Sequence, residues 1–209
     1  MDKLDAGIID NVDALKNPYN TFYQKKNIPQ PHNGFTSADR LLNSIQKLDY
    51  RLESQFEGYR FRAQSARQIG GQAPRKAQNN KSKLKIEYSY PYNVEYRYDP
   101  EDNSYLRWRT GMPEIDANNN QQIRAKNIVV MEVFSEQIEG PYYNDLELEK
   151  QGQCRVYQNG KIISCTWQKS EHNPSSKLEF LDENGEEIYF IPGQTWIEIV
   201  EPNQEVIWE

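Results

Sequence analysis

The sequence predicts an α+β fold: a mainly antiparallel sheet built from meanders and hairpins, with one or two helices packed on it. Residues 83–109 and 127–200 alternate apolar and polar positions between turn signals, whereas a well-formed helical stripe occurs only over 37–48. The composition agrees, because a lean 36% hydrophobic content is supplemented by 14 Tyr and 4 Trp. Such rings bury a large area yet keep a polar edge, which suits sheets with one solvated face.

Composition divides the 209 residues into three parts. Residues 1–62 are predicted to be a helical and irregular N-terminal part, 63–82 a flexible basic loop, and 83–209 a β-rich C-terminal domain. The loop lacks an apolar period, and it is either a contact for an anionic surface or a solvated linker, with the linker favoured. The net charge of −6 opposes binding to polyanions, so no nucleic-acid partner is expected.

Two helices are predicted in the N-terminal part. The first would fall within 1–16, where apolar residues have roughly helical spacing, at Leu4, Ile8, Val12 and Leu15. The second is predicted over 37–48, because Thr36 can cap it and an apolar stripe follows, at Leu41, Leu42, Ile45 and Leu48.

The C-terminal domain is predicted strand by strand from its alternation and turns. Residues 84–90, 94–98 and 105–109 should form a three-stranded antiparallel meander. Ile128–Met131 is the most apolar run and predicts a central strand buried on both faces. A hairpin over 178–190, a last core strand over 195–200 and an edge strand over 205–208 complete the sheet.

The two cysteines flank a hairpin signal. Asn159-Gly160 predicts a two-residue turn, and pairing outward from it places Cys154 directly opposite Cys165. That separation is within reach of a disulfide, although two buried thiols in a reduced protein are the other interpretation. A disulfide would indicate an oxidising compartment. Two cysteines and two scattered histidines do not make a metal site, so neither metal nor cofactor is expected.

Six short motifs occur in an order that resembles one family. They are Pro-His-Asn-x-Phe-Thr-Ser at 31–37, Tyr-x-Tyr-Asp at 96–99, Tyr-x-Arg at 105–107, Ala-x-Asn and an apolar run at 125–130, Asn-Gly-Lys at 159–161 followed by Trp167, and Pro-Gly-x-Thr-Trp-Ile at 192–197. Over roughly residues 20–200 the chain therefore resembles the YerB-like family of predicted bacterial lipoproteins. The resemblance implies a location in the cell envelope, outside the cytoplasm, and no established activity.

The resemblance concerns the C-terminal two thirds of the family pattern, without its N-terminal half or lipoprotein signal. The start, Met1-Asp2-Lys3, is polar and acidic rather than a signal peptide, and no run of about 18 apolar residues occurs. We therefore expect the chain as given to be soluble. Membrane association is expected only through a lipid anchor of a longer form.

Two groups of residues are candidate binding sites. The first precedes the predicted helix start, where backbone amides attract anions, and comprises His32, Asn33, Thr36 and Ser37. The second comprises the meander tyrosines Tyr88, Tyr90 and Tyr92, which could stack on sugar rings or a peptide. The structural interpretations are a histidine at a tight bend and aromatic rings that pack the sheet, and these are favoured.

Three functions follow from these observations. A non-catalytic envelope module that binds a cell-wall polymer, a peptide or an envelope protein ranks first, because no nucleophile, phosphate-loop or metal motif occurs. A purely structural module ranks second. An envelope hydrolase or transferase, with His32 contributing to a site that the N-terminal half completes, ranks third.

Overall fold

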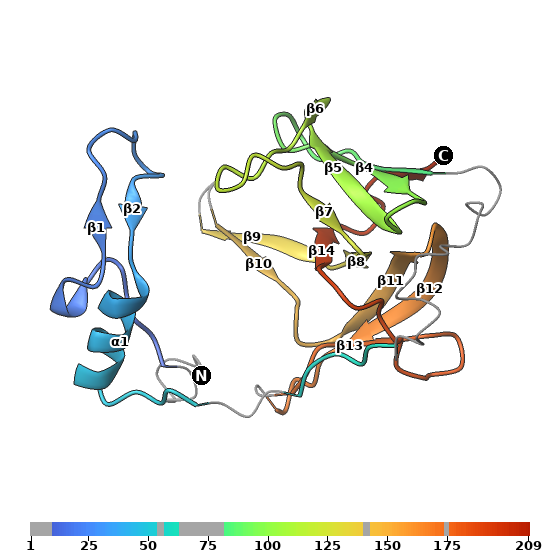
Figure 1. Cartoon of the computed structure of the whole chain (residues 1–209). Coiled ribbons are helices and arrows are strands. Elements are labelled where there is room, and N and C mark those ends of the chain that lie inside the picture. Colours follow the sequence, from blue (N-terminus) through green and yellow to red (C-terminus); the bar gives the residue numbers. More distant parts are fainter. Residues whose placement is uncertain (1–9, 54–56, 63–81, 140–142, 174–175) are drawn as a thin grey trace. The chain divides into compact units, whose positions relative to one another are not determined.

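The computed structural model describes residues 10–53, 57–62, 82–139, 143–173 and 176–209 (Figure 1). Contacts divide the chain into two compact units, Met1–Glu57 and Gly58–Glu209. The predicted basic loop lies outside the described residues except for Ser82, and so do Leu4 and Ile8 of the first predicted helix.

The first unit contains η1 (Pro18–Asn20), the short antiparallel pair β1 (Tyr23–Gln24) and β2 (Gly34–Phe35), and α1 (Ala38–Lys47). The predicted second helix is confirmed, but its N-cap is Ser37, whose hydroxyl accepts a bond from the Arg40 amide at 3.4 Å. The first predicted helix is wrong over 10–16, where the chain forms a turn. A helix stopped by Asn17-Pro18 would be too short to be stable without packing.

The first sheet of the second unit has the order β15-β3-β4-β5-β6, and β7 also pairs with β5. Its strands are β3 (Lys83–Ile86), β4 (Val94–Asp99), β5 (Ser104–Arg109), β6 (Met112–Pro113), β7 (Arg124–Ala125) and β15 (Val206–Trp208). The predicted meander and C-terminal edge strand are confirmed. The strand predicted over 84–90 ends at Ile86 instead, because Ile86 pairs with Val94 and the residues between them have no ladder to join.

The second sheet has the order β13-β12-β11-β8-β14. Its strands are β8 (Asn127–Glu132), β11 (Gln151–Gln158), β12 (Lys161–Gln168), β13 (Glu179–Leu181) and β14 (Thr195–Val200). β8 lies between β11 and β14 and is buried on both faces, as predicted. β14 runs parallel to β8 at the sheet edge, and the other pairs are antiparallel.

A further pair of strands forms a sheet of its own. β9 (Ser135–Glu139) and β10 (Tyr143–Leu146) follow β8 along the chain and pair antiparallel with each other. This ribbon has no strand pattern in the sequence, because its residues are too polar to show one, and it was not predicted.

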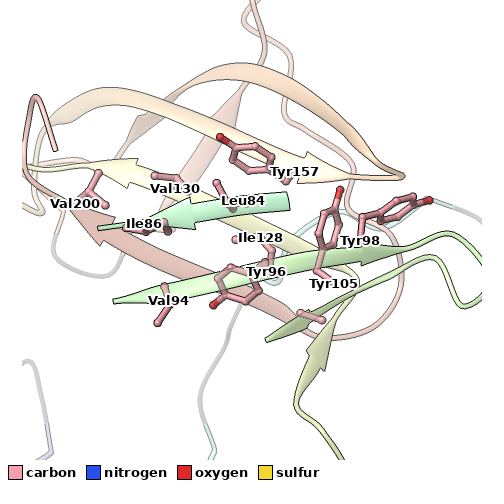
Figure 2. Packing of buried hydrophobic residues seen from close by; sticks show 11 residues of the cluster. Leu84, Ile86, Val94, Tyr96, Tyr98, Tyr105, Ile128, Val130, Tyr157 and Val200 are labelled. Atoms are coloured by element: carbon pink, nitrogen blue, oxygen red, sulfur yellow. The ribbon is translucent and has the colours of Figure 1, made fainter. Parts of the chain in front are cut away.

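Two apolar clusters lie on opposite faces of the second sheet. Ile128 and Val130 of β8 point into the first cluster, where side chains from both sheets meet (Figure 2). Val129 and Met131 point into the second cluster, together with Trp167. The alternation of strand side chains explains why one apolar run supplies both clusters.

The β11–β12 hairpin has the predicted register, with Cys154 opposite Cys165. Its turn residues have φ values of 55° at Asn159 and 64° at Gly160, as the Asn-Gly signal requires. The two cysteines are buried and joined by a disulfide, with their Cα atoms 4.8 Å apart.

Candidate functional site

A pair of opposite charges is buried between the two sheets. Arg107 on β5 is 4% exposed and Glu198 on β14 is 7% exposed, and Arg107 Nη2 lies 3.5 Å from Glu198 Oε1. Tyr105 on β5 and Val200 on β14, each two residues away from one of these charges, point into the same interior. Since an unpaired buried charge is strongly destabilising, each residue depends on the other for its place in the fold.

Two tyrosine hydroxyls complete the surroundings of Glu198. Tyr96 donates to Glu198 Oε1 and accepts from Arg107 Nε at 2.9 Å. The Tyr88 hydroxyl lies 3.1 Å from Glu198 Oε2 and 2.8 Å from the Ile199 carbonyl oxygen. We call Tyr88, Tyr96, Arg107 and Glu198 the buried network.

Burial, and then the charge of Glu198, raise the pKa of both the Tyr88 and the Tyr96 hydroxyls well above the usual range. The nearby Arg107 guanidinium opposes this shift without cancelling it. Both tyrosines therefore remain neutral hydrogen-bond donors at any physiological pH. Their hydroxyls donate the hydrogen bonds that hold the Glu198 carboxylate in place.

The buried network extends toward solvent through a second carboxylate. Glu114 forms an ion pair with Arg107 and a further one with the exposed Arg109, at 2.9 Å. The Arg107 guanidinium also lies over the Trp196 ring, 4.6 Å from its centroid. Every charge in this chain of residues is therefore matched by an opposite charge.

An aromatic loop projects from the end of this support. Residues 87–93 connect β3 to β4, and Tyr88 ties the loop to the buried network. Beyond that anchor, Tyr90 is 84% exposed and Tyr92 is 63% exposed, on either side of Pro91. We call Tyr90, Pro91 and Tyr92 the aromatic tip.

Backbone bonds hold the aromatic tip at both of its ends. The Tyr92 amide donates to the Ser89 carbonyl at 2.8 Å, and the Thr110 amide donates to the Asn93 carbonyl at 3.2 Å. On the other side, the Glu87 amide donates to the Glu205 carbonyl at 3.3 Å. Because these bonds fix the backbone of the loop, the backbone would lose little conformational entropy on binding a ligand.

The structure separates the three tyrosines that the sequence grouped together. Tyr88 is half-buried and has a bonded hydroxyl, whereas Tyr90 and Tyr92 offer their rings to solvent. Three other meander tyrosines are core residues, as alternation favoured: Tyr96, Tyr98 and Tyr105. Among these six tyrosines, Tyr90 and Tyr92 are therefore the two whose rings are mostly exposed.

The other predicted group lies in the first unit. His32 and Asn33 belong to the connection between β1 and β2, and His32 is exposed. The Thr36 hydroxyl donates to the Thr21 carbonyl at 2.8 Å, and Ser37 caps α1. The hydroxyls of Thr36 and Ser37 therefore have structural partners, which leaves His32 and Asn33 as the groups able to face a ligand.

The charged half of the buried network was not predicted from the sequence. A signal for it existed, because Arg107 lies two positions from the core residue Tyr105, and Glu198 lies two positions from Val200. Alternation along a strand places such residues on the same face. Within the described residues, no group of three or more His, Cys, Asp and Glu side chains is arranged to hold a metal ion. The described helices include none that is long and apolar enough to cross a membrane.

Comparisons with known proteins identify relatives of the whole chain. Residues 84–197 match the family model described as "Protein of unknown function (DUF3048) C-terminal domain". The chain is 24% identical over 201 residues to the protein named "Putative lipoprotein YerB" of Bacillus subtilis (strain 168), which covers 95% of this chain and 56% of that protein. The predicted family resemblance is confirmed, and the alignment is longer than its six motifs had indicated.

A solved structure shares the fold. The crystal structure of the YerB protein from Bacillus subtilis matches with a TM-score of 0.78 at 22% identity, over 99% of this chain and 66% of that one. The chain thus spans little more than half the length of its curated relative. The activity and partners of the full-length relatives are therefore matters for proposal.

Proposed function

This chain belongs to the DUF3048 protein family and carries its C-terminal domain, and from that premise we propose that it is a non-catalytic binding module of the cell envelope. We further propose that it acts outside the cytoplasm and that a longer form is held at the membrane by a lipid anchor. The name of its Bacillus subtilis relative as a lipoprotein supports this location. The ligand would be a cell-wall polymer, a peptide or another envelope protein.

The exposure of the aromatic tip is the observation that carries the proposal. Tyr90 and Tyr92 flank a proline and are two of the most exposed large side chains of the second unit. Tyrosine rings supply rigid contact area together with a polar edge, and exposed rings of this kind recur in sugar- and peptide-binding surfaces.

The buried network supports the proposal because it anchors the loop that carries the aromatic tip. Because the Tyr88 hydroxyl contacts Glu198 and Ile199 of β14, the loop that leaves β3 of the first sheet is also tied to the second sheet. Preorganisation of this kind favours recognition over a merely structural role, for which an exposed aromatic tip would have no use.

A sedimentation assay with insoluble bacterial cell wall tests the proposal. The purified chain is mixed with increasing amounts of wall material, and the bound fraction is compared with that of the Tyr90→Ala/Tyr92→Ala variant. We expect saturable binding that weakens by about tenfold or more in the variant, which corresponds to the loss of roughly 1.4 kcal/mol. Tyr189→Ala is the matched control, because it removes another exposed tyrosine from a different loop.

Equal binding by the wild type and the Tyr90/Tyr92 variant would remove the aromatic tip from the proposal. No binding to wall by either protein would direct the search to peptides and envelope proteins, using the same pair of variants. Circular dichroism must show that each variant keeps its β-sheet content.

A further inference from the structure

We propose that one face of the β9–β10 ribbon binds a basic protein segment in which Lys or Arg residues alternate with apolar ones. The surface involves other residues than the aromatic tip, so the inference stands independently of the proposed function. The ribbon follows β8 along the chain, and its two strands form a sheet of their own (Figure 1).

Strand pairing brings a defined set of side chains to this face. Glu136 pairs with Asp145, and the Glu147 amide donates to the Phe134 carbonyl at 3.0 Å, which continues the ladder. Since side chains alternate along a strand and directly opposed residues share a face, one face carries Phe134, Glu136, Asp145 and Glu147. The register shifts between Tyr143 and Asn144, so Ile138 lies at an irregularity at the end of this face.

Two apolar side chains, one on this face and one at its end, are open to solvent. Phe134 is 52% exposed and Ile138 is 64% exposed. An isolated pair of strands is marginally stable in water, and exposed apolar side chains add nothing to that stability. Exposed apolar groups close together and rimmed by charges are typical of interaction surfaces.

The charges on the same face select the kind of partner. The carboxylates of Glu136 and Asp145 lie directly opposite each other, and like charges in that position are destabilising. Neither has an ion-pair partner among the described residues, whereas Glu147 is paired with Lys150 at 2.8 Å. A cation placed between Glu136 and Asp145 would replace repulsion by attraction.

Charge and apolar exposure together therefore favour one class of occupant. A neutral apolar segment would cover Phe134 and Ile138 but leave the two carboxylates repelling each other. An anionic wall polymer would add to the repulsion. A segment that places a Lys or Arg between the carboxylates and apolar side chains against Phe134 and Ile138 satisfies both requirements.

Fluorescence anisotropy with a labelled peptide of alternating Lys and Leu residues tests this inference on the full chain. We expect saturable binding that weakens by about tenfold or more in Glu136→Lys/Asp145→Lys and by a similar factor in Phe134→Ser/Ile138→Ser. The control is Glu101→Lys/Glu183→Lys, which makes the same change of net charge at two exposed turn carboxylates and should leave the affinity within about twofold.

A reversed pair of charges separates recognition from loss of folding. A peptide of alternating Glu and Leu should bind the Glu136→Lys/Asp145→Lys variant and not the wild type. The inference is overturned if that variant binds neither peptide, if the Glu101/Glu183 control loses as much affinity, or if the Phe134/Ile138 variant binds like the wild type. It is also overturned if sedimentation shows dimers that the Phe134/Ile138 variant lacks, because a second copy would then occupy the face.

Discussion

The amide of Gly160 donates a hydrogen bond to the hydroxyl of Tyr105 across 3.1 Å, and this bond joins the hairpin turn of one sheet to a strand of the other. A second bond reinforces it, because the Asn103 side chain donates to the Asn159 side chain at 2.8 Å. The hairpin turn that sets the register of β11 and β12 thus also holds the two sheets together.

Replacement of Gly160 by Ala should therefore lower the free energy of unfolding by about 2–4 kcal/mol. The φ value of 64° disfavours any side chain, and a Cβ atom would come within 2.6 Å of the Tyr98 ring. Gly185→Ala is the matched control, since its φ is 79° but nothing lies within 4 Å of its Cβ position. This control substitution should lower the free energy of unfolding by only about 1–2 kcal/mol. Equal losses in urea unfolding would contradict the proposed contact with Tyr98.

The buried network predicts a strong coupling between Arg107 and Glu198. Arg107→Met leaves Glu198 charged between the sheets, so the free energy of unfolding should fall by about 3–5 kcal/mol. Adding Glu198→Gln removes that charge yet keeps an acceptor for the tyrosine hydroxyls. The double variant should then be more stable than Arg107→Met alone.

A double-mutant cycle in urea measures this coupling. We expect an interaction energy of at least about 1 kcal/mol, in the range that contacting residues show. Additive effects of the two substitutions would mean that the ion pair does not form.

The buried tyrosines predict how stability changes at alkaline pH. The raised pKa of Tyr96 means that the unfolded chain loses this proton near pH 10 while the folded chain keeps it. The folded state then binds more protons, so its stability is complete below about pH 10 and falls as the pH rises above that value. Tyr96→Phe should reduce the slope of this decline by up to about 1.4 kcal/mol per pH unit.

Urea unfolding between neutral pH and about pH 11 gives the slope. Val130→Ala is a control that lowers stability through a cavity in the same cluster, without a titrating group, so its curve should be displaced but parallel to that of the wild type. An unchanged slope in Tyr96→Phe would show that its hydroxyl ionises equally in both states.

The parts of the fold that the sequence predicted well are those set by neighbouring residues. Asn159-Gly160 determines a turn, and the turn then determines eight cross-strand pairs by counting. The meander follows from local alternation, and the strand buried on both faces follows from a local apolar run. Each of these features depends on residues close together along the chain.

Features that depend on distant residues could not be predicted in this way. Tyr96 and Glu198 are separated by 102 positions. Nothing near Glu198 in the sequence indicates that a distant tyrosine will donate to it and that an arginine will balance its charge. The alternating pattern continues through Tyr88 and Tyr90, so the predicted strand extended past the end of β3. Such a pattern does not show where the partner strand begins. Tyr88 differs from Tyr90 and Tyr92 because its hydroxyl is bonded to the carbonyl of Ile199. That partner lies far away in the sequence, so the difference could not be predicted.

The bond between Cys154 and Cys165 should add stability without determining the fold. It closes a loop with a sequence separation of 11 within a hairpin whose turn already sets the register. Chain entropy limits the contribution of so short a loop to about 3 kcal/mol. The Cys154→Ala/Cys165→Ala variant should therefore unfold at lower urea concentration with its β-sheet circular dichroism unchanged.

The proposed location outside the cytoplasm favours an intact bond between Cys154 and Cys165. The mass of the chain isolated from an envelope fraction should therefore rise by two hydrogens on reduction. Two free thiols in that fraction would remove this support for the location.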